Sequence, residues 1–165
     1  MKKHVLLIPL FAFIFCFSNS AEAQNYQTAL GARLGYPLAI SFKHFLNENS
    51  AIEAYVGTRW YSTYRWTNIS GAYLYHKPIA GLDGLQWYVG GGASAYFWGF
   101  KNTFPGAERY NNTTIGIQGY LGLDYKFDDV PINISLDWVP TYFFNGFGNG
   151  FGAGYGSLAV RYVLK

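Results

Sequence analysis

Apolar and polar side chains alternate at successive positions along most of the chain. Between residues 51 and 61, for example, Ile52 and Val56 fall on one side of the alternation, and Glu53 and Arg59 fall on the other. A period of two is the pattern of a β-strand with one apolar and one polar face. The pattern predicts eight strands, over Gln27–Tyr36, Leu38–Leu46, Ala51–Tyr61, Trp66–Lys77, Leu85–Trp98, Thr114–Phe127, Ile132–Phe143 and Tyr155–Leu164.

The connectors between these segments differ between the two sides of the predicted sheet. One side has short connectors rich in turn-forming residues: Asn47–Ser50, Pro78–Gly84 and Asp128–Pro131. The other side has Tyr36–Pro37, Ser62–Arg65, Gly99–Thr113 and Asn145–Gly154, and the last two of these are long. Short turns at one rim and longer loops at the other are typical of a small transmembrane β-barrel. We therefore predict an all-β fold, an eight-stranded antiparallel up-and-down transmembrane barrel.

The charged residues inside the predicted strands fall on the polar face, and the remaining charges after the N-terminal segment sit in connectors or at strand ends. Those on the polar face are Arg33, Lys43, Glu53, Arg59, Asp124, Lys126, Asp137 and Arg161. A water-soluble barrel would place apolar residues inside and charges outside. A membrane barrel does the reverse, because an outward Arg or Lys at the bilayer midplane costs about 2–4 kcal/mol. We expect a lumen charge network in which Glu53, Asp124 and Asp137 compensate Arg33, Arg59 and Arg161.

The composition agrees with this interpretation. Aromatic residues make up 21% of the 165 residues and charged residues only 13%, which excludes a disordered chain. Half of the residues are hydrophobic, yet the mean hydropathy is only +0.03, because polar residues interrupt every apolar stretch after the N-terminus. The formal net charge of +3 is too small to indicate a nucleic-acid partner.

The N-terminus has the pattern of a secretory signal peptide. Lys2 and Lys3 precede the apolar run Val5–Phe17, and Ala21-Glu22-Ala23 is a small-x-small cleavage site. We expect cleavage between Ala23 and Gln24. Because the single cysteine, Cys16, lies in the removed segment, the mature chain has no disulfide and no thiol chemistry.

Aromatic residues gather near the predicted strand ends and in the long loops. We expect an aromatic girdle at the two membrane interfaces, formed by Trp60, Trp66, Trp87, Trp98, Trp138, Tyr125 and Phe127. Aromatic and Arg side chains are enriched in binding surfaces, and Arg or Lys can bind the phosphates of lipopolysaccharide. The candidate surface-loop contacts are Tyr64, Arg65, Trp66, Lys101, Arg109, Phe147 and Phe151.

Glycines occupy alternate positions from Gly146 to Gly156. The run follows no strand–helix unit, so it is not interpreted as a nucleotide-binding loop. It suits a mobile outer loop. Its glycines nevertheless share a face with the lipid-facing Leu158, and the alternation alone does not account for this.

We expect no catalytic residues, no cofactor and no metal site. The predicted mature chain has two histidines, His44 and His76, and both map near the short-turn rim. No Ser–His–acid constellation can be assembled from them at the outer loops. Two separated histidines without cysteine do not make a plausible zinc site.

Several stretches resemble the small eight-stranded outer-membrane β-barrel proteins, of the OmpA-transmembrane-domain, OmpX and opacity-protein kind. They are the first hairpin, Leu30–Phe45, the pair Leu121–Phe127 and Pro131–Trp138, and the closing Ser157–Tyr162. The resemblance implies one outer-membrane barrel domain over residues 24–165. It also implies insertion by the barrel-assembly machinery, with the last strand as the signal.

The expected function is a non-catalytic barrel with a largely plugged lumen and a structural, envelope-integrity or surface-interaction role. Its partners would be outer-membrane lipid and lipopolysaccharide. The alternatives are a narrow or gated pore for ions or small solutes, or an accessory subunit of a larger outer-membrane complex. An outer-leaflet lipid-modifying enzyme is the least favoured alternative.

Overall fold

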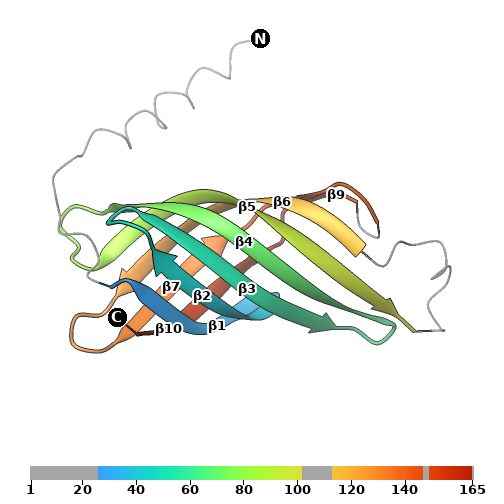
Figure 1. Ribbon diagram of the computed structural model, residues 1–165, viewed down its shortest axis with the longest axis horizontal. Helices are drawn as coiled ribbons and strands as arrows, with labels where there is room; N and C mark the ends of the chain where they lie inside the picture. The colour runs from blue at the N-terminus through green and yellow to red at the C-terminus, as the bar shows by residue number, and fades with distance from the viewer. Residues whose placement is uncertain (1–25, 102–112, 147–148, 165) are drawn as a thin grey trace, which may run out of the picture.

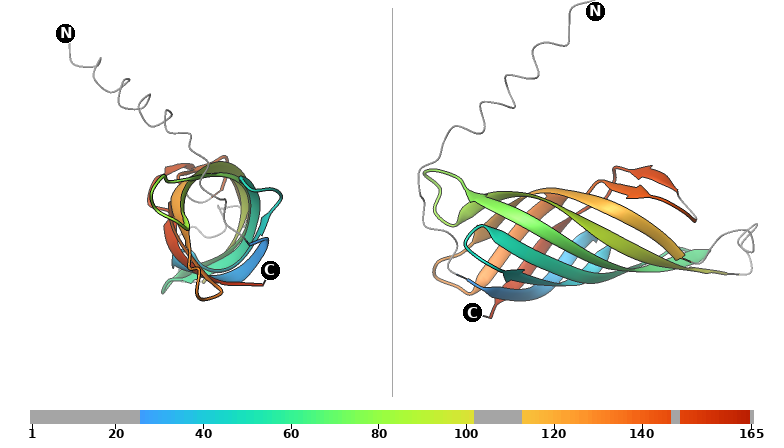
Figure 2. Two further views of the ribbon diagram at one scale, coloured as in Figure 1. Left: turned by 90° about the vertical axis from the view of Figure 1, so that its left-hand side faces the viewer. Right: turned by 45° about the horizontal axis from the view of Figure 1, so that its top comes forward.

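The computed structural model describes residues 26–101, 113–146 and 149–164, which form one closed antiparallel sheet. Neighbouring strands follow the order β5-β4-β3-β2-β1-β10-β7-β6, and β5 pairs with β6 to close the ring. Figure 2 shows this ring in its left-hand view. The strands are β1 (Thr28–Tyr36), β2 (Leu38–Phe45), β3 (Ser50–Trp60), β4 (Tyr64–Pro78), β5 (Leu85–Phe100), β6 (Thr113–Lys126), β7 (Ile132–Trp138), β8 (Thr141–Phe143), β9 (Gly150–Gly152) and β10 (Gly156–Val163).

The ten strands build an eight-stranded wall. β7 and β8 pair with β6 in a single register, since Leu121 faces Trp138 and Gln118 faces Thr141. They are interrupted at Val139–Pro140, where proline has no amide hydrogen to donate. On the side away from β6, β10 pairs with β7 and β9 pairs with β8, so β9 and β10 also form one strand of the wall. The predicted eight-stranded antiparallel barrel is therefore confirmed.

The two ends of the barrel differ. At the short-turn end, residues 46–49, 79–84 and 127–131 connect the strands. At the opposite, long-loop end, β4 and β5 reach lengths of 15 and 16 residues, so β3, β4 and β5 project beyond the first two strands (Figure 1). The connector after β3 spans only residues 61–63, because the strands continue into the segment expected to be loop.

Side chains alternate between the lumen and the outside along every long strand. On β2, Leu38, Ile40 and Phe42 are exposed, whereas Ser41 and Lys43 are completely buried. The interior is thus polar and charged, and the exterior is apolar, which is the reverse of a water-soluble protein. Among the described residues, no helix is long and apolar enough to cross a membrane.

A β-bulge accounts for one glycine of the run, Gly152. β7 and β8 are linked by residues 139–140, but the facing residues 153–155 number one more. This extra residue shifts the alternation, so Tyr155 and Gly152 both face the interior. A Cβ on Gly152 would lie 2.6 Å from the Tyr155 ring, and Phe151 points outward and is 68% exposed. Gly152 lacks a side chain because the Tyr155 ring occupies that space.

Candidate functional site

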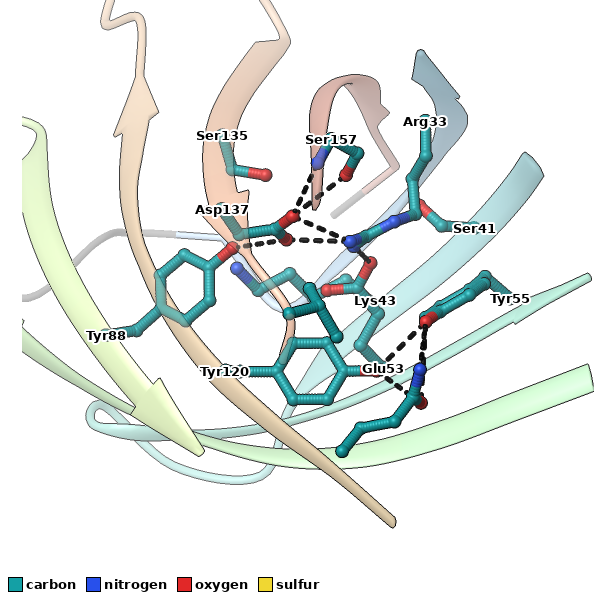
Figure 3. A network of polar contacts seen from close by, with 12 residues as sticks. Arg33, Ser41, Lys43, Glu53, Tyr55, Tyr88, Tyr120, Ser135, Asp137 and Ser157 are labelled. Carbon is teal, nitrogen blue, oxygen red and sulfur yellow. Dashed lines mark hydrogen bonds and ion pairs between the residues drawn. The ribbon is translucent and has the colours of Figure 1, made fainter. Parts of the chain in front are cut away.

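The interior of the barrel holds a cluster of ion pairs centred on Glu53 (Figure 3). Glu53 Oε1 accepts hydrogen bonds of 2.6 Å from Arg33 on β1 and of 2.6 Å from Arg161 on β10. Arg33 Nη2 also donates to both oxygens of Asp137, at 2.9 and 2.7 Å. All four side chains are at least 93% buried. The cluster joins four strands, β1, β3, β7 and β10, from inside.

Polar neighbours bond to many of the other polar atoms of this cluster. Tyr88 donates a 2.8 Å hydrogen bond to Asp137, and Ser157 donates to it from both its amide and its hydroxyl at 3.0 Å. Arg161 donates to Ser41 at 2.9 Å and to Ser135 at 2.8 Å. A buried charge is costly unless it is paired and hydrogen-bonded. These hydroxyl groups therefore satisfy part of the hydrogen-bonding capacity of the buried ions.

A second ion pair lies nearer the short-turn end. Lys43 on β2 pairs with Asp124 on β6, and Asn133 donates to the other oxygen of the same carboxylate. The Lys43 ammonium also lies 4.9 Å from the centre of the Tyr88 ring, a cation–π contact. His76 Nε2 is 3.6 Å from Asp124, and its ring stacks on Tyr88. Lys43 and Asp124 are completely buried.

The formal charges of the two groups cancel. We use the term lumen charge network for the three cations Arg33, Lys43 and Arg161 and the three carboxylates Glu53, Asp124 and Asp137. Each carboxylate contacts at least one of the cations. The network therefore fills the lumen without a net charge, which lowers the cost of burying six ionised groups.

Two residues expected in the network lie outside it. Arg59 is only half-buried, donates to the carbonyl oxygen of Gly35 at 3.2 Å, and covers the Tyr36 ring. Lys126 donates to the carbonyl oxygen of Phe127 at 2.6 Å at the end of β6. Both residues face the expected side, but they lie near strand ends, where the carboxylates of the barrel centre are out of reach. Of the three arginines expected to be compensated by carboxylates, Arg33 and Arg161 are so paired, both with Glu53, and Arg59 is not.

Uncharged side chains joined by hydrogen bonds fill a further part of the lumen. Tyr55 and Tyr120 approach within 3.1 Å through their hydroxyls, and Gln118 bridges them with bonds of 3.2 and 3.0 Å. The Arg33 guanidinium lies 4.6 Å from the centre of the Tyr55 ring. This contact links the neutral group directly to the lumen charge network. Figure 3 draws the hydrogen bonds within the neutral group as dashed lines.

Some buried polar atoms lack a protein partner. Among the described residues these include Glu53 Oε2, Arg33 Nε, both ring nitrogens of His76, Gln86 Oε1 and the Tyr26 hydroxyl. Buried polar atoms are nearly always paired, either with protein or with ordered water. Ordered water molecules could supply these missing partners.

Aromatic rings gather inside the long-loop end. We name this the long-loop aromatic cluster: Tyr36, Trp66, Tyr96, Phe143 and Tyr155. Tyr36 and Tyr155 meet edge to face at 4.9 Å, and Tyr96 meets Phe143 in the same way at 5.2 Å. Burial raises the pKa of the Tyr155 phenol to about 12, so this ring stays neutral. The cluster caps the polar interior.

The prediction that Trp66 is a girdle residue and a surface contact is wrong. Its side chain is 1% exposed and belongs to the long-loop aromatic cluster, because β4 begins at Tyr64 and its alternation places Trp66 inside. Trp98 faces the same interior and donates to Thr114 at 2.9 Å. Trp60 and Trp138 do point outward, with 66% and 49% exposure.

The other proposed surface contacts fall into three groups. Arg65, Lys101 and Phe151 are exposed at the long-loop end. Tyr64 is half-buried and stacks on Tyr61 at a ring distance of 4.5 Å. Arg109 and Phe147 lie outside the described residues, as do Ala23, Gln24 and the rest of the expected signal peptide.

The two histidines occupy different environments. His44 faces outward on β2, and its Nδ1 contacts the Thr28 hydroxyl at 2.9 Å. His76 is completely buried, and its ring lies 4.8 Å from Phe45 and 4.9 Å from Tyr88. His76 lies near the short-turn rim as expected, since its amide donates to the Asn49 carbonyl in a short turn at 2.6 Å, but its side chain points into the lumen. The even-numbered residues of β4 face the lumen, and this alternation could have placed His76 inside. Aromatic residues on both faces of β4 obscured the alternation.

Comparisons with known proteins identify the fold. No protein-family model matches the sequence, and no curated protein matches it. Among solved structures, the crystal structure of Neisserial surface protein A (NspA) superposes with a TM-score of 0.59. The match covers 83% of this chain and 93% of the other, at 15% sequence identity. The shared architecture is the eight-stranded barrel found in small outer-membrane proteins.

Proposed function

We propose that this chain is an integral protein of the bacterial outer membrane, a small barrel with a plugged lumen and no catalytic role. The observation that carries the proposal is the inverted distribution of side chains. Ile40 is 67% exposed and Leu136 is 58% exposed on the outer wall, whereas Lys43 and Asp124 are completely buried. Water would solvate the charged face and exclude the apolar one, so the arrangement suits lipid outside and a polar lumen.

The closed sheet supports the same proposal. In hydrocarbon, each unsatisfied backbone N–H or C=O costs several kcal/mol, because no water can bond to it. The pairing of β5 with β6 and of β1 with β10 leaves the central wall without a free edge. An exported chain of this kind would be inserted by the barrel-assembly machinery, as its resemblance to small outer-membrane barrels implies.

The lumen charge network favours a structural or surface role over transport. Its cations and carboxylates pair with one another across the interior, so these charges are not free to bind a passing ion. His44 and His76 are engaged with Thr28 and with the rings of Phe45 and Tyr88, which favours a non-catalytic role. We place the functional surface at the long-loop end, where Arg65, Lys101 and Phe151 are exposed.

A narrow pore is the second candidate. The unpartnered atoms Glu53 Oε2, Arg33 Nε and His76 Nδ1 favour it, because water molecules bonded to them would line the interior. Such waters support a conducting path only if they connect the two ends of the barrel.

Two measurements test the proposal. The protein expressed in a Gram-negative host should fractionate with the outer membrane and migrate faster in gels when unheated than when boiled. Recovery in the soluble periplasm would contradict it. In planar bilayers, the plugged lumen predicts no reproducible unit conductance, whereas a reproducible conductance would establish the pore instead.

A further inference from the structure

An exposed arginine lies at the end of the apolar outer wall. Arg65 on β4 faces Trp60 on β3 and Gly99 on β5 in one register row across three strands. The Arg65 side chain extends over Gly99, where a Cβ would lie 3.2 Å from its Nε atom. Gly99 thus leaves room for the guanidinium to lie flat on the wall. Trp60, 66% exposed, flanks it on the other side.

An apolar surface begins below this row. Two positions further along the same outward faces are Thr58, Thr67 and Phe97, and the next row includes Val56 and Ile69. Phe97, Val56 and Ile69 are 46%, 53% and 54% exposed, respectively. The Arg65 guanidinium therefore stands where an apolar surface ends.

The length of β4 matches a bilayer. Lys77 is the next charged residue on its outward face, twelve positions after Arg65. At about 3.3 Å per residue and a tilt of about 45°, the two cations are separated by roughly 28 Å along the barrel axis. A hydrocarbon core is about 30 Å thick. Arg65 and Lys77 thus mark the two headgroup levels of the membrane.

The charges at the two ends have opposite signs. Among the described residues, the charged side chains at the long-loop end are Arg59, Arg65 and Lys101. The turns of the short-turn end carry the four carboxylates Glu48, Asp83, Asp128 and Asp129, and the adjoining strand ends carry the two cations Lys77 and Lys126, so the net charge of this end is negative. Lys101 is held near Arg65, because its amide bonds to the Thr63 carbonyl in the β3–β4 connector at 3.0 Å. The long-loop end thus favours an anion.

We propose that Arg65, flanked by Trp60 and assisted by Lys101, binds the phosphate group of an outer-leaflet lipid. The site rests on the proposed function, since it requires the long-loop end to face the outer leaflet. A guanidinium can donate two parallel hydrogen bonds to a phosphate. An indole at this level packs against the sugar and upper acyl chains of the lipid.

The neighbouring wall favours a lipid over a free phosphate ion. An inorganic phosphate would contact Arg65 and Lys101 alone, in water, where such pairs contribute little. A phospholipid or lipid A molecule also covers Val56, Ile69 and Phe97. The phosphate then fixes the position of a molecule whose chains already lie on the apolar wall.

Native mass spectrometry of the folded barrel in octyl glucoside tests the proposal. The probes are diphosphorylated lipid A, the same lipid after removal of its phosphates, and inorganic phosphate. We expect wild-type protein to bind the phosphorylated lipid about tenfold more tightly than the dephosphorylated one. Arg65→Gln should abolish that preference, and Arg65→Lys should retain part of it. Lys77→Gln is the matched control and should leave the preference unchanged.

Three results would overturn the lipid-phosphate site. They are an unchanged preference in Arg65→Gln, an equal loss in Lys77→Gln, and competition by inorganic phosphate at the lipid's own concentration. Each variant is checked for the faster gel migration of the folded barrel before binding is measured. Failure of wild-type protein to enter lipid bilayers would refute the proposed function, whereas entry without a phosphate preference would refute this site alone.

Discussion

Arg33 and Asp137 form an ion pair of 2.7 Å although 104 residues separate them along the chain. Their strands are not neighbours, because β10 lies between β1 and β7 in the wall. The pair therefore crosses the lumen in front of β10, where Ser157 donates to the same carboxylate. With Ser157, it links β1, β7 and β10 and so reinforces the closure of the barrel.

Removing the Asp137 carboxylate should destabilise the barrel. Asp137→Ala leaves Arg33 with Glu53 alone and removes the acceptor of Tyr88 and Ser157. Breaking a buried ion pair by removing one partner costs about 3–5 kcal/mol. Urea unfolding in detergent micelles should show a loss in this range. Asp128→Ala, in an exposed turn, is the control, and equal stability of the two variants would contradict the network.

Lys43 and Asp124 should be energetically coupled. Lys43→Met and Asp124→Leu each leave a buried charge without its ionic partner, whereas the double variant leaves neither. A double-mutant cycle should give a coupling energy of about 1–3 kcal/mol. The control cycle combines Asp124→Leu with Lys77→Met, whose ammonium is on the outward face of β4. Additive effects in the first cycle would show that the pair does not act as a unit.

Two neighbouring glycines should respond differently to the same substitution. In Gly152→Ala the new methyl group meets the Tyr155 ring at 2.6 Å, and overpacking of this kind costs about 1–3 kcal/mol. In Gly154→Ala the methyl group meets no heavy atom within 4 Å, so stability should hardly change. Thermal unfolding of the two variants compares them directly. A larger loss of thermal stability for Gly154→Ala than for Gly152→Ala would contradict the position given to the β-bulge.

Lipid contact should distinguish Trp60 from Trp66. In bilayers with brominated acyl chains, an outward indole is quenched and an indole inside the barrel is not. Because Trp60 is 66% exposed and Trp66 1%, Trp60→Phe should lower the quenched fraction of the fluorescence and Trp66→Phe should raise it. The opposite result would mean that β4 has its faces reversed.

The alternation along the sequence predicted the strands closely, because a period of two is a local property of the chain. Expected and observed ends differ by only a few residues, as at Ala51–Tyr61 against β3, Ser50–Trp60. The same alternation fails where an extra residue enters the wall. The bulge between Gly152 and Gly156 reverses the faces. β9 was expected to be part of the loop Asn145–Gly154 because of its glycines. Irregular alternation on β4 likewise hid the inward positions of Trp66 and His76.

The alternation in the sequence is enough to predict eight strands and to place the charges inside those strands, away from their ends, on one face. Which of these charges meet follows from the tertiary structure alone. Glu53 bonds Arg33 and Arg161, at separations of 20 and 108 residues, and leaves Arg59 at the rim. The reason is physical: alternation assigns a side chain to a face, but its height and neighbours inside the lumen follow from the stagger of strands around the closed barrel. That stagger depends on all the strand pairings together, and no local pattern records it.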